Sequence, residues 1–365
     1  MKRTLYVVAL LLLSCPAVRA EQEVTSKYKV SFYGHIKNDV SYDTRKTAGD
    51  DYMMYVTSNK PGDSVFRESA RASRIGFNIS DGGDLTAKVE ADFLGLSESA
   101  GGTPGATTDL RLRHAYVNLK HGDFNFLAGQ TWLLTPLELP GSNNELLMGY
   151  SGALWYRAPQ VRATWQASET LTVAAAAVRP TRKLTDAEGT SSGLPSMQGQ
   201  AQLKIGKAKL TLAGAWGRWK NTTTDQEGDV NLLDLGYNVP LTEQLTLNGQ
   251  VWTGRNLYDF LGGIGNMGYD GDEVRASGGF ANLLIKPWQK VFFNTAWGID
   301  DPKDDDLAVG ARSKNTTLMG NVNYQLMETL LLTMETSYMV TQYKTATGFS
   351  DYGDMHFQFS CKYIF

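Results

Sequence analysis

Apolar and polar residues alternate with a period of two along most of this chain, from near residue 28 to the C-terminus. In the first such segment Val30, Phe32 and Ile36 fall on one parity, whereas Lys37 and Asp39 fall on the other. Successive side chains of a β-strand point to opposite faces, so this pattern predicts strands with one apolar and one polar face. We count sixteen of them, beginning near residues 28, 72, 85, 110, 123, 154, 171, 196, 209, 230, 245, 274, 290, 316, 330 and 355.

The connections between these strands alternate in length. Short turns, such as the SDGGD sequence at 80–84, separate long polar connections at 43–70, 95–109, 133–152, 180–195, 220–229, 255–273, 300–315 and 343–353. Membrane barrels show this asymmetry, because their periplasmic turns are short and their extracellular loops are long. No linker or change of composition interrupts the pattern, so we expect a single domain over residues 21–365.

The number of strands decides which face meets water. Sixteen strands enclose a lumen too wide for side chains to fill, so the inner face must be wet and polar. The apolar face then contacts lipid, and aromatic side chains near both strand ends mark the two membrane interfaces. They are Trp165, Tyr237, Tyr324 and Tyr363 at one end, and Tyr42, Phe93, Trp216, Trp297 and Tyr338 at the other. The sequence therefore predicts an all-β fold, a transmembrane antiparallel β-barrel in the outer membrane of a Gram-negative bacterium.

The final strand carries the strongest local signal. Met355, Phe357, Phe359 and Tyr363 share one face, and the chain ends on Phe365. A terminal aromatic residue on an alternating strand resembles the recognition signal of outer-membrane barrels that await assembly. Pairing of this strand with the first would close the barrel and remove its exposed edges.

Residues 1–20 have the pattern of a secretory signal peptide. Lys2 and Arg3 precede an apolar run, and small residues follow as far as Ala20. The run is too short for a membrane-spanning helix, and no later stretch reaches the roughly 18 apolar residues that one needs. Removal of these residues takes away three basic and no acidic side chains, which changes the formal net charge from −3 to −6. Cys15 leaves two alternatives open, acylation as in a lipoprotein or an uncleaved anchor.

Few sequence motifs point to enzymatic chemistry. The segment Gly263–Gly268 matches a dinucleotide fingerprint, but it lies in a polar connection rather than between a buried strand and a helix. The acidic run 300–306 lacks the spaced ligands of a calcium loop, so we interpret it as solvated charge or weak cation bridging. The four histidines lack zinc spacing, and the net charge gives no basic excess for nucleic acid. We expect no catalytic residue, cofactor, metal or nucleic-acid partner.

Cationic side chains gather on the polar parity of neighbouring strands. We expect them to face the lumen together along one wall: Arg74, Lys88, Arg111, Arg113, Arg157 and Arg162. A group of arginines in a narrow passage of low dielectric favours anions. The same arginines could instead only neutralise carboxylates such as Glu90 and Asp92 and stiffen the wall, and both roles are compatible. The strand at 110–120 is ambiguous, because its arginines share parity with apolar Val117.

The connection at 133–152 is unusually apolar, with several leucines and Met148 between turn residues. Such a segment is better placed folded into the barrel than extended into water, and there it would narrow the lumen as a constriction loop. Its two carboxylates, Glu138 and Glu145, would then lie opposite or beside the arginines. The acidic outer connections oppose anion entry, so the net charge by itself does not settle ion selectivity.

Seven sequence blocks, taken in order, resemble the DcaP-like outer-membrane porins. They are GHIKNDVSYD (34–43), RASRIGF (71–77), KVEADFLG (88–95), RLRHAYVNL (111–119), LAGQTW (127–132), YRAPQVR (156–162) and GIDDP (298–302). The resemblance implies a trimer of sixteen-stranded barrels, each with an inward loop after the fifth strand and a basic channel for small anions such as dicarboxylates. It assigns Arg74, Arg111, Arg113 and Arg162 to that basic wall. Some members begin with a helical coiled-coil segment, whereas here only EQEVTSK precedes the first strand, so barrel walls alone would hold the trimer.

The sequence therefore predicts a porin, a passive and water-filled channel for small hydrophilic solutes that prefers anions and forms a homotrimer in contact with membrane lipid. Two alternatives from other classes stay open. One is a non-conducting structural or adhesive barrel with a plugged lumen, and the other is a hydrolase embedded in the barrel.

Overall fold

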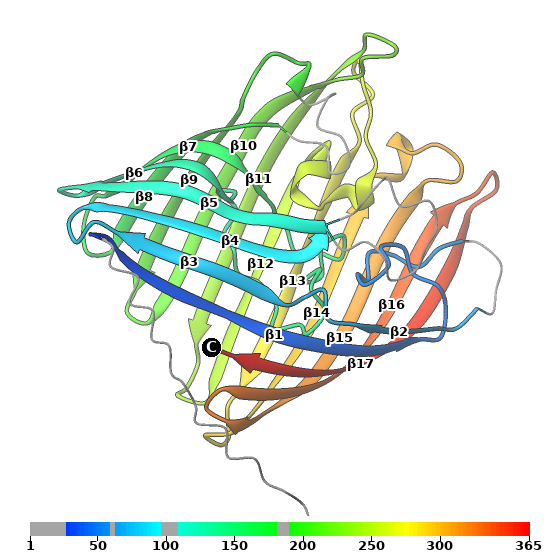
Figure 1. Ribbon diagram of the computed structural model, residues 1–365. Coiled ribbons are helices and arrows are strands. Elements are labelled where there is room, and N and C mark those ends of the chain that lie inside the picture. Colours follow the sequence, from blue (N-terminus) through cyan, green and yellow to red (C-terminus); the bar gives the residue numbers. More distant parts are fainter. Residues whose placement is uncertain (1–26, 59–62, 96–108, 181–189) are drawn as a thin grey trace, which may run out of the picture.

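The computed structural model describes residues 27–58, 63–95, 109–180 and 190–365. These ranges form one antiparallel sheet that closes into a barrel (Figure 1). The predicted signal peptide at 1–20, with Cys15, lies outside them, as does most of the predicted connection at 95–109. No helix within these ranges is long and apolar enough to cross a membrane.

Seventeen strand segments build the sheet. They are β1 (Lys29–Asp43), β2 (Val65–Ser69), β3 (Arg74–Ser80), β4 (Leu85–Gly95), β5 (Asp109–His121), β6 (Phe124–Trp132), β7 (Arg157–Gln166), β8 (Leu171–Val178), β9 (Ser196–Ile205), β10 (Ala208–Lys220), β11 (Glu227–Pro240), β12 (Leu245–Arg255), β13 (Arg275–Ile285), β14 (Val291–Pro302), β15 (Arg312–Met327), β16 (Leu330–Lys344) and β17 (Phe349–Ile364). Three short 3-10 helices lie in the connections: η1 (Leu257–Phe260), η2 (Gly263–Gly265) and η3 (Asp304–Asp306).

The segments β2 and β3 are two parts of one barrel strand. Both pair with the same side of β1: Tyr42 lies opposite Phe66 of β2, and Phe32 lies opposite Phe77 of β3. A turn at 70–73 separates the two parts. The barrel therefore has sixteen strands, as the sequence predicts.

The first and last strands close the barrel. Val40 of β1 lies opposite Phe359 of β17, and main-chain hydrogen bonds of 3.0 and 3.1 Å join Gly34 to Phe365. The ring of Phe365 stacks on Phe32 with a centroid distance of 5.2 Å. Closure pairs both terminal strands and so removes the edges that would otherwise template aggregation.

The short turns gather at the end of the barrel where β1 begins and β17 ends, and the longer connections lie at the other end (Figure 1). Two predicted connections are wrong in part, and the first, at 43–70, contains the strand segment β2. Residues 343–353 are not a long loop, because β16 and β17 continue and meet in a turn closed by Thr345 N donating to Gly348 O at 2.7 Å. Strands that rise above the membrane meet water on both faces, so the alternation that revealed them fades there.

The two faces of the barrel divide as the alternation predicts. Apolar side chains cover the outside, where Val161 for example is 67% exposed. Inside, Asn282 Nδ2 donates to Asn248 Oδ1 at 2.9 Å, and Asn294 Nδ2 donates to Asn321 Oδ1 at 3.1 Å. An apolar exterior around a polar interior is the arrangement of a barrel in lipid.

A β-bulge settles the ambiguous strand β5. Between Glu90 and Ala91 of β4 the opposing residue in β5 jumps from His114 to Leu112, so Arg113 is the extra residue. The bulge shifts the parity of the strand. Apolar side chains on both sides of it therefore face outward, while Arg113 is buried inside the barrel.

Three long connections fold into the barrel and pack on one another: residues 44–58, 133–156 and 256–274. Tyr150 N donates to Leu261 O at 2.8 Å, which joins the second connection to the third. Val56 and Ile264 are fully buried. The segment Gly263–Gly268, which the sequence places in a polar connection, thus lies inside the barrel, where Ile264 joins a hydrophobic cluster.

Candidate functional site

The connection 133–156 joins β6 to β7 and crosses the inside of the barrel. Inward side chains of β9, β12 and β15 bind its main chain: Gln198 Oε1 accepts from Leu134 N at 3.0 Å, Asn248 Nδ2 donates to Leu139 O at 3.0 Å, and Asn321 Nδ2 donates to Gly141 O at 2.7 Å. These contacts place the connection against inward side chains of three strands, and the constriction loop predicted from the sequence stays a prediction, as does its effect on the width of a pore.

The backbone of this connection is held in conformations that a free loop would avoid. Leu137, Leu147, Met148 and Tyr150 have φ between +55° and +62°, a region that side chains with a Cβ rarely adopt. Gly152 has φ +102°, and a Cβ there would lie 2.0 Å from a carbonyl oxygen of β13. Such strain persists where surrounding contacts over-determine the chain, so the wall and the connection form one rigid unit.

Two carboxylates of β4 bind the arginines of β5. Arg113 donates to Glu90 Oε1 at 2.6 Å and to Asp92 Oδ2 at 2.8 Å. Arg111 binds both oxygens of Asp92, at 3.0 and 2.6 Å, and donates to Tyr52 Oη at 2.6 Å. Burial raises the pKa of Tyr52 to about 12, so this phenol stays neutral beside the cluster. The charges of Arg111 and Arg113 are therefore largely compensated.

Glu145 is the carboxylate of the connection that reaches the basic wall. It accepts hydrogen bonds from Lys37 Nζ and from Arg74 Nη2, both at 3.2 Å. Burial raises the pKa of Glu145, but these two cations outweigh burial and hold that pKa well below its usual range. The ionised carboxylate thus neutralises part of the wall from the side of the lumen.

Other cations of the same wall lack a close carboxylate. Lys88 Nζ lies 3.8 Å from Glu90 Oε2, beyond hydrogen-bond distance. Arg162 donates to Gln160 Oε1 at 2.9 Å and to the carbonyl oxygen of Trp132. Within the part of the chain that the structure describes, no carboxylate forms an ion pair with Arg157, Arg162 or Lys362.

A cavity of about 260 Å³ lies between the basic wall and the crossing connection. Cations from five strands line it, together with Trp132, Trp155, Glu145, Asn323, Leu331 and Thr333. The cations are Lys37, Arg74, Arg113, Arg157 and Lys362. The structure thus brings three of the six predicted cations to one cavity, and places Lys88, Arg111 and Arg162 beside it on the same wall.

Lys37 and Lys362 were not among the cations predicted from the sequence. Both have inward parity, Lys37 with Asp39 in β1 and Lys362 with Ser360 in β17. Because β1 pairs with both β17 and β3, these two lysines adjoin the basic wall. Both lysines could have been predicted from the polar parity of their strands together with the pairing of the first and last strands.

Glu138 lies on a different wall from Glu145. It forms an ion pair with Lys209 of β10 and accepts a hydrogen bond from Asn238 Nδ2 of β11 at 3.1 Å. Of the two carboxylates predicted to accompany the arginines, Glu145 alone lies beside them, because the connection between the two glutamates crosses the lumen.

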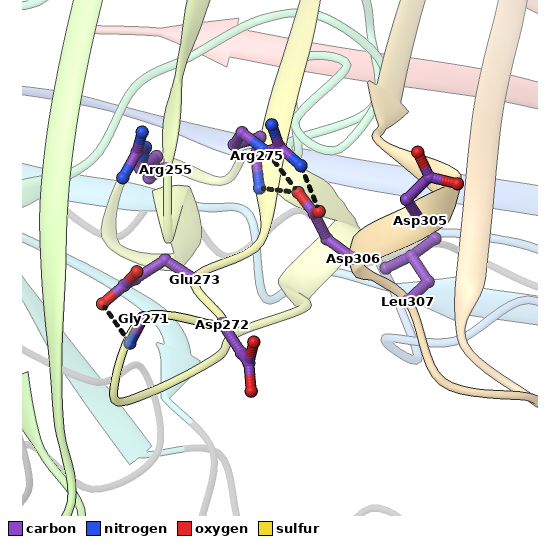
Figure 2. A pocket seen from close by; sticks show the side chains of 8 residues that line it. All are labelled: Arg255, Gly271, Asp272, Glu273, Arg275, Asp305, Asp306 and Leu307. Atoms are coloured by element: carbon purple, nitrogen blue, oxygen red, sulfur yellow. Dashed lines mark hydrogen bonds and ion pairs between the residues drawn. The ribbon is translucent and has the colours of Figure 1, made fainter.

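A second hollow, of about 510 Å³, opens at the rim among the long connections (Figure 2). Its Arg275 is already bound by Asp306, with Nε to Oδ2 at 2.7 Å and Nη2 to Oδ1 at 2.5 Å, and its Glu273 accepts from Gly271 N at 3.4 Å. The acidic run 300–306 is dispersed, since Asp300 faces inward and accepts from Ile264 N at 3.2 Å. Among the described residues, no group of three or more His, Cys, Asp or Glu is placed to hold a metal ion.

Comparison with solved structures agrees with the fold. The chain is similar to the outer-membrane channel DcaP of Acinetobacter baumannii, with 18% identity, a TM-score of 0.75 and coverage of 93% of this chain and 97% of that one. An anion-selective porin from Comamonas acidovorans matches with 15% identity and a TM-score of 0.63 over 93% and 100% of the two chains. The trimer form of OmpT from Vibrio cholerae matches with 12% identity and a TM-score of 0.60 over the same shares.

A search of curated proteins found no match. Comparison with protein families found that residues 7–346 match the family described as Gram-negative porin. The expected resemblance to porins is thereby confirmed, and this match covers most of the chain. Together with the closed barrel of sixteen strands, it shows that the chain belongs to the Gram-negative porin family and is an outer-membrane channel protein.

Proposed function

We propose that this porin is a passive channel for small hydrophilic solutes, that it prefers anions, dicarboxylates among them, and that it works as a homotrimer. One observation carries the anion preference: cations outnumber carboxylates around the inner cavity. The cations of this wall are Lys37, Arg74, Lys88, Arg111, Arg113, Arg157, Arg162 and Lys362, and their carboxylate neighbours are Asp39, Glu90, Asp92 and Glu145.

The excess positive charge surrounds the cavity of about 260 Å³. Walls of low dielectric strengthen the field of fixed charges, so uncompensated cations raise the local concentration of anions. Arg111 and Arg113 contribute less to this field than the sequence analysis assumed, because Glu90 and Asp92 bind them. The structural role and the selective role of the arginines therefore coexist on one wall.

Two similar structures support the finer parts of the proposal. The porin from Comamonas acidovorans is described as anion-selective, and OmpT of Vibrio cholerae is described in a trimer form. The apolar exterior described above would serve equally for contact with lipid and with neighbouring barrels.

The test is conductance across a planar bilayer under a KCl gradient, with the purified wild-type protein. We expect current steps in groups of three and a reversal potential of the sign set by chloride. A reversal potential of the potassium sign would overturn the anion preference, and independent single steps would overturn the trimer.

A plugged barrel is the second candidate, and the packing of three connections inside the lumen favours it. In that case the two hydrophobic clusters around Leu154 and Tyr150 would close the passage. Folding of the protein is first verified by its resistance to denaturation on a gel. If this folded protein then gives no current, the result supports the plugged barrel and rejects the channel.

A further inference from the structure

Arg157 is the one cation of the cavity that is both deeply buried and free of hydrogen bonds. It is 8% exposed, it lines the cavity, and no acceptor among the described residues binds it. The guanidinium carries five N–H donors, and its nitrogen atoms are not among the fully buried ones, so the donors are open toward the cavity that Arg157 lines. The guanidinium of Arg157 can therefore donate hydrogen bonds to an oxyanion that enters the cavity.

Two indole rings hold this guanidinium. Its central carbon lies 4.3 Å from the ring centroid of Trp132 and 5.6 Å from that of Trp155. The rings themselves pack edge to face at 5.8 Å. Because the two ring planes differ by 78°, at most one of them stacks flat on the guanidinium. These cation–π contacts position the group without using its N–H donors as a carboxylate would.

The neighbouring cations differ from Arg157 in this respect. Carboxylates occupy the donors of Arg113, and Glu145 occupies a donor of Arg74. Lys362 also lines the cavity without an ion pair among the described residues, but an ammonium group is a point charge without a preferred plane. The free, planar fork of Arg157 is thus suited to discriminate an oxyanion from a chloride ion.

We propose that Arg157 is the specificity-determining residue of the channel, and that its guanidinium binds the carboxylate of a small organic anion through two parallel hydrogen bonds during passage. Lys362 adds charge, and the apolar side chains of Trp155, Leu147 and Leu139 on the cavity surface contact the carbon part of the solute. This inference rests on the proposed anion channel. It goes further because it assigns selectivity among anions to one guanidinium group rather than to the summed charge of the wall.

The test compares wild type with Arg157→Lys in a planar bilayer. Lysine keeps the charge but loses the fork and the stacking, so the preference for chloride over potassium is retained. We record chloride current while sodium propionate is added and derive an apparent dissociation constant from the concentration dependence of the block. We expect saturable block of wild type and a loss of propionate affinity of about tenfold or more in the variant, as fits the loss of a bidentate, charge-assisted pair.

Two further variants make the comparison specific. Arg275→Lys alters an arginine at the rim, already bound by Asp306, and is expected to match wild type. Arg157→Gln removes the charge as well, and is expected to lower both propionate affinity and chloride preference. It also replaces Arg157→Lys as the test if the latter does not assemble.

The experiment distinguishes failure of the proposed function from failure of the role assigned to Arg157. A wild-type channel that prefers potassium would overturn the proposed function itself. A chloride-preferring wild type whose propionate block does not saturate, or is unchanged in both Arg157 variants, would overturn only the role of Arg157. Block by inorganic phosphate without block by propionate would reject a carboxylate as the ligand.

Discussion

The inside of this barrel has two walls of opposite character. On one wall, formed by β1, β3 to β7 and β17, ion pairs such as Arg113 with Glu90 and Arg111 with Asp92 cover the surface. On the other, formed mainly by β8 and β10 to β13, the inward side chains include Trp219 and Trp252, which are 1% and 4% exposed. The inner face of a barrel strand was expected to be polar throughout, and on this second wall apolar side chains stand beside polar ones such as Asn248 and Asn282.

This difference explains where the inward connections lie. Leu133, Leu154 and Phe260 pack with Trp219 and Trp252 in one hydrophobic cluster. Burial of apolar surface stabilises contact by about 25 cal/mol per Å², so the apolar wall attracts the connections. The charged wall offers no such gain and stays in contact with the cavity. The apolar side chains on one wall therefore position the inward connections, and the cavity lies beside the opposite, charged wall.

The largest expected effect comes from removing charge from the polar wall. In the double variant Arg111→Ala, Arg113→Ala, the buried Asp92 loses both of its arginines and Glu90 keeps only Tyr33 at hydrogen-bond distance, at a cost of about 3–5 kcal/mol. The excess of positive charge on this wall then falls. We expect the reversal potential under a KCl gradient to move toward that of potassium and the thermal midpoint to fall.

The control for this variant lies on the outer face. Arg218→Ala removes an exposed arginine paired with Glu227 at 2.9 Å, a surface pair worth about 1 kcal/mol or less. It is expected to leave the reversal potential unchanged. An unchanged reversal potential in the double variant as well would contradict the distinction between the two walls.

The next effect concerns the apolar wall. Trp252 Nε1 donates to Gly152 O at 2.7 Å and so joins this wall to the crossing connection. Trp252→Ala removes that bond and a buried indole, which destabilises the packed state by about 3–5 kcal/mol. We expect a higher and noisier single-channel conductance, because the connection leaves its place more often. Trp216→Ala, which removes an indole from the outer face of β10, is the matched control. Equal conductance in both variants would argue against docking through the apolar wall.

The sequence predicts those features that depend on the alternation of side chains, and it does not predict those that depend on strand register or on the path of a connection. Lipid outside and water inside impose the alternation, so the strands and the inward position of Arg74 were predictable. The pairing of Arg113 with Glu90 was not, because it depends on the register of β4 and β5 and on a bulge within the ambiguous strand. Glu138 and Glu145 looked equivalent in one apolar segment, and only its path across the lumen separates them.

The smallest expected effect comes from the one carboxylate that crosses from the connection to the charged wall. Glu145→Gln keeps the shape of the side chain and removes its charge, so Lys37 and Arg74 lose their counter-ion. Loss of these charge-assisted hydrogen bonds costs about 1–3 kcal/mol, and anion preference rises. Glu138→Gln, on the other wall beside Lys209, is the matched control and is expected to change selectivity less.

The pH dependence of ion selectivity tests whether Glu145 is held ionised by the charged wall. Because the pKa of Glu145 is lowered in the folded protein, its contribution is fully present above the ordinary Glu value of about 4.3 and is lost only as the pH falls through the lowered value. Wild-type selectivity arising from this group is therefore constant from neutral pH down to about 4.3 and moves toward that of Glu145→Gln only below it. A change centred between pH 5 and 7 that disappears in Glu145→Gln would show that Lys37 and Arg74 do not hold this carboxylate, and that the crossing connection is not fixed to the charged wall.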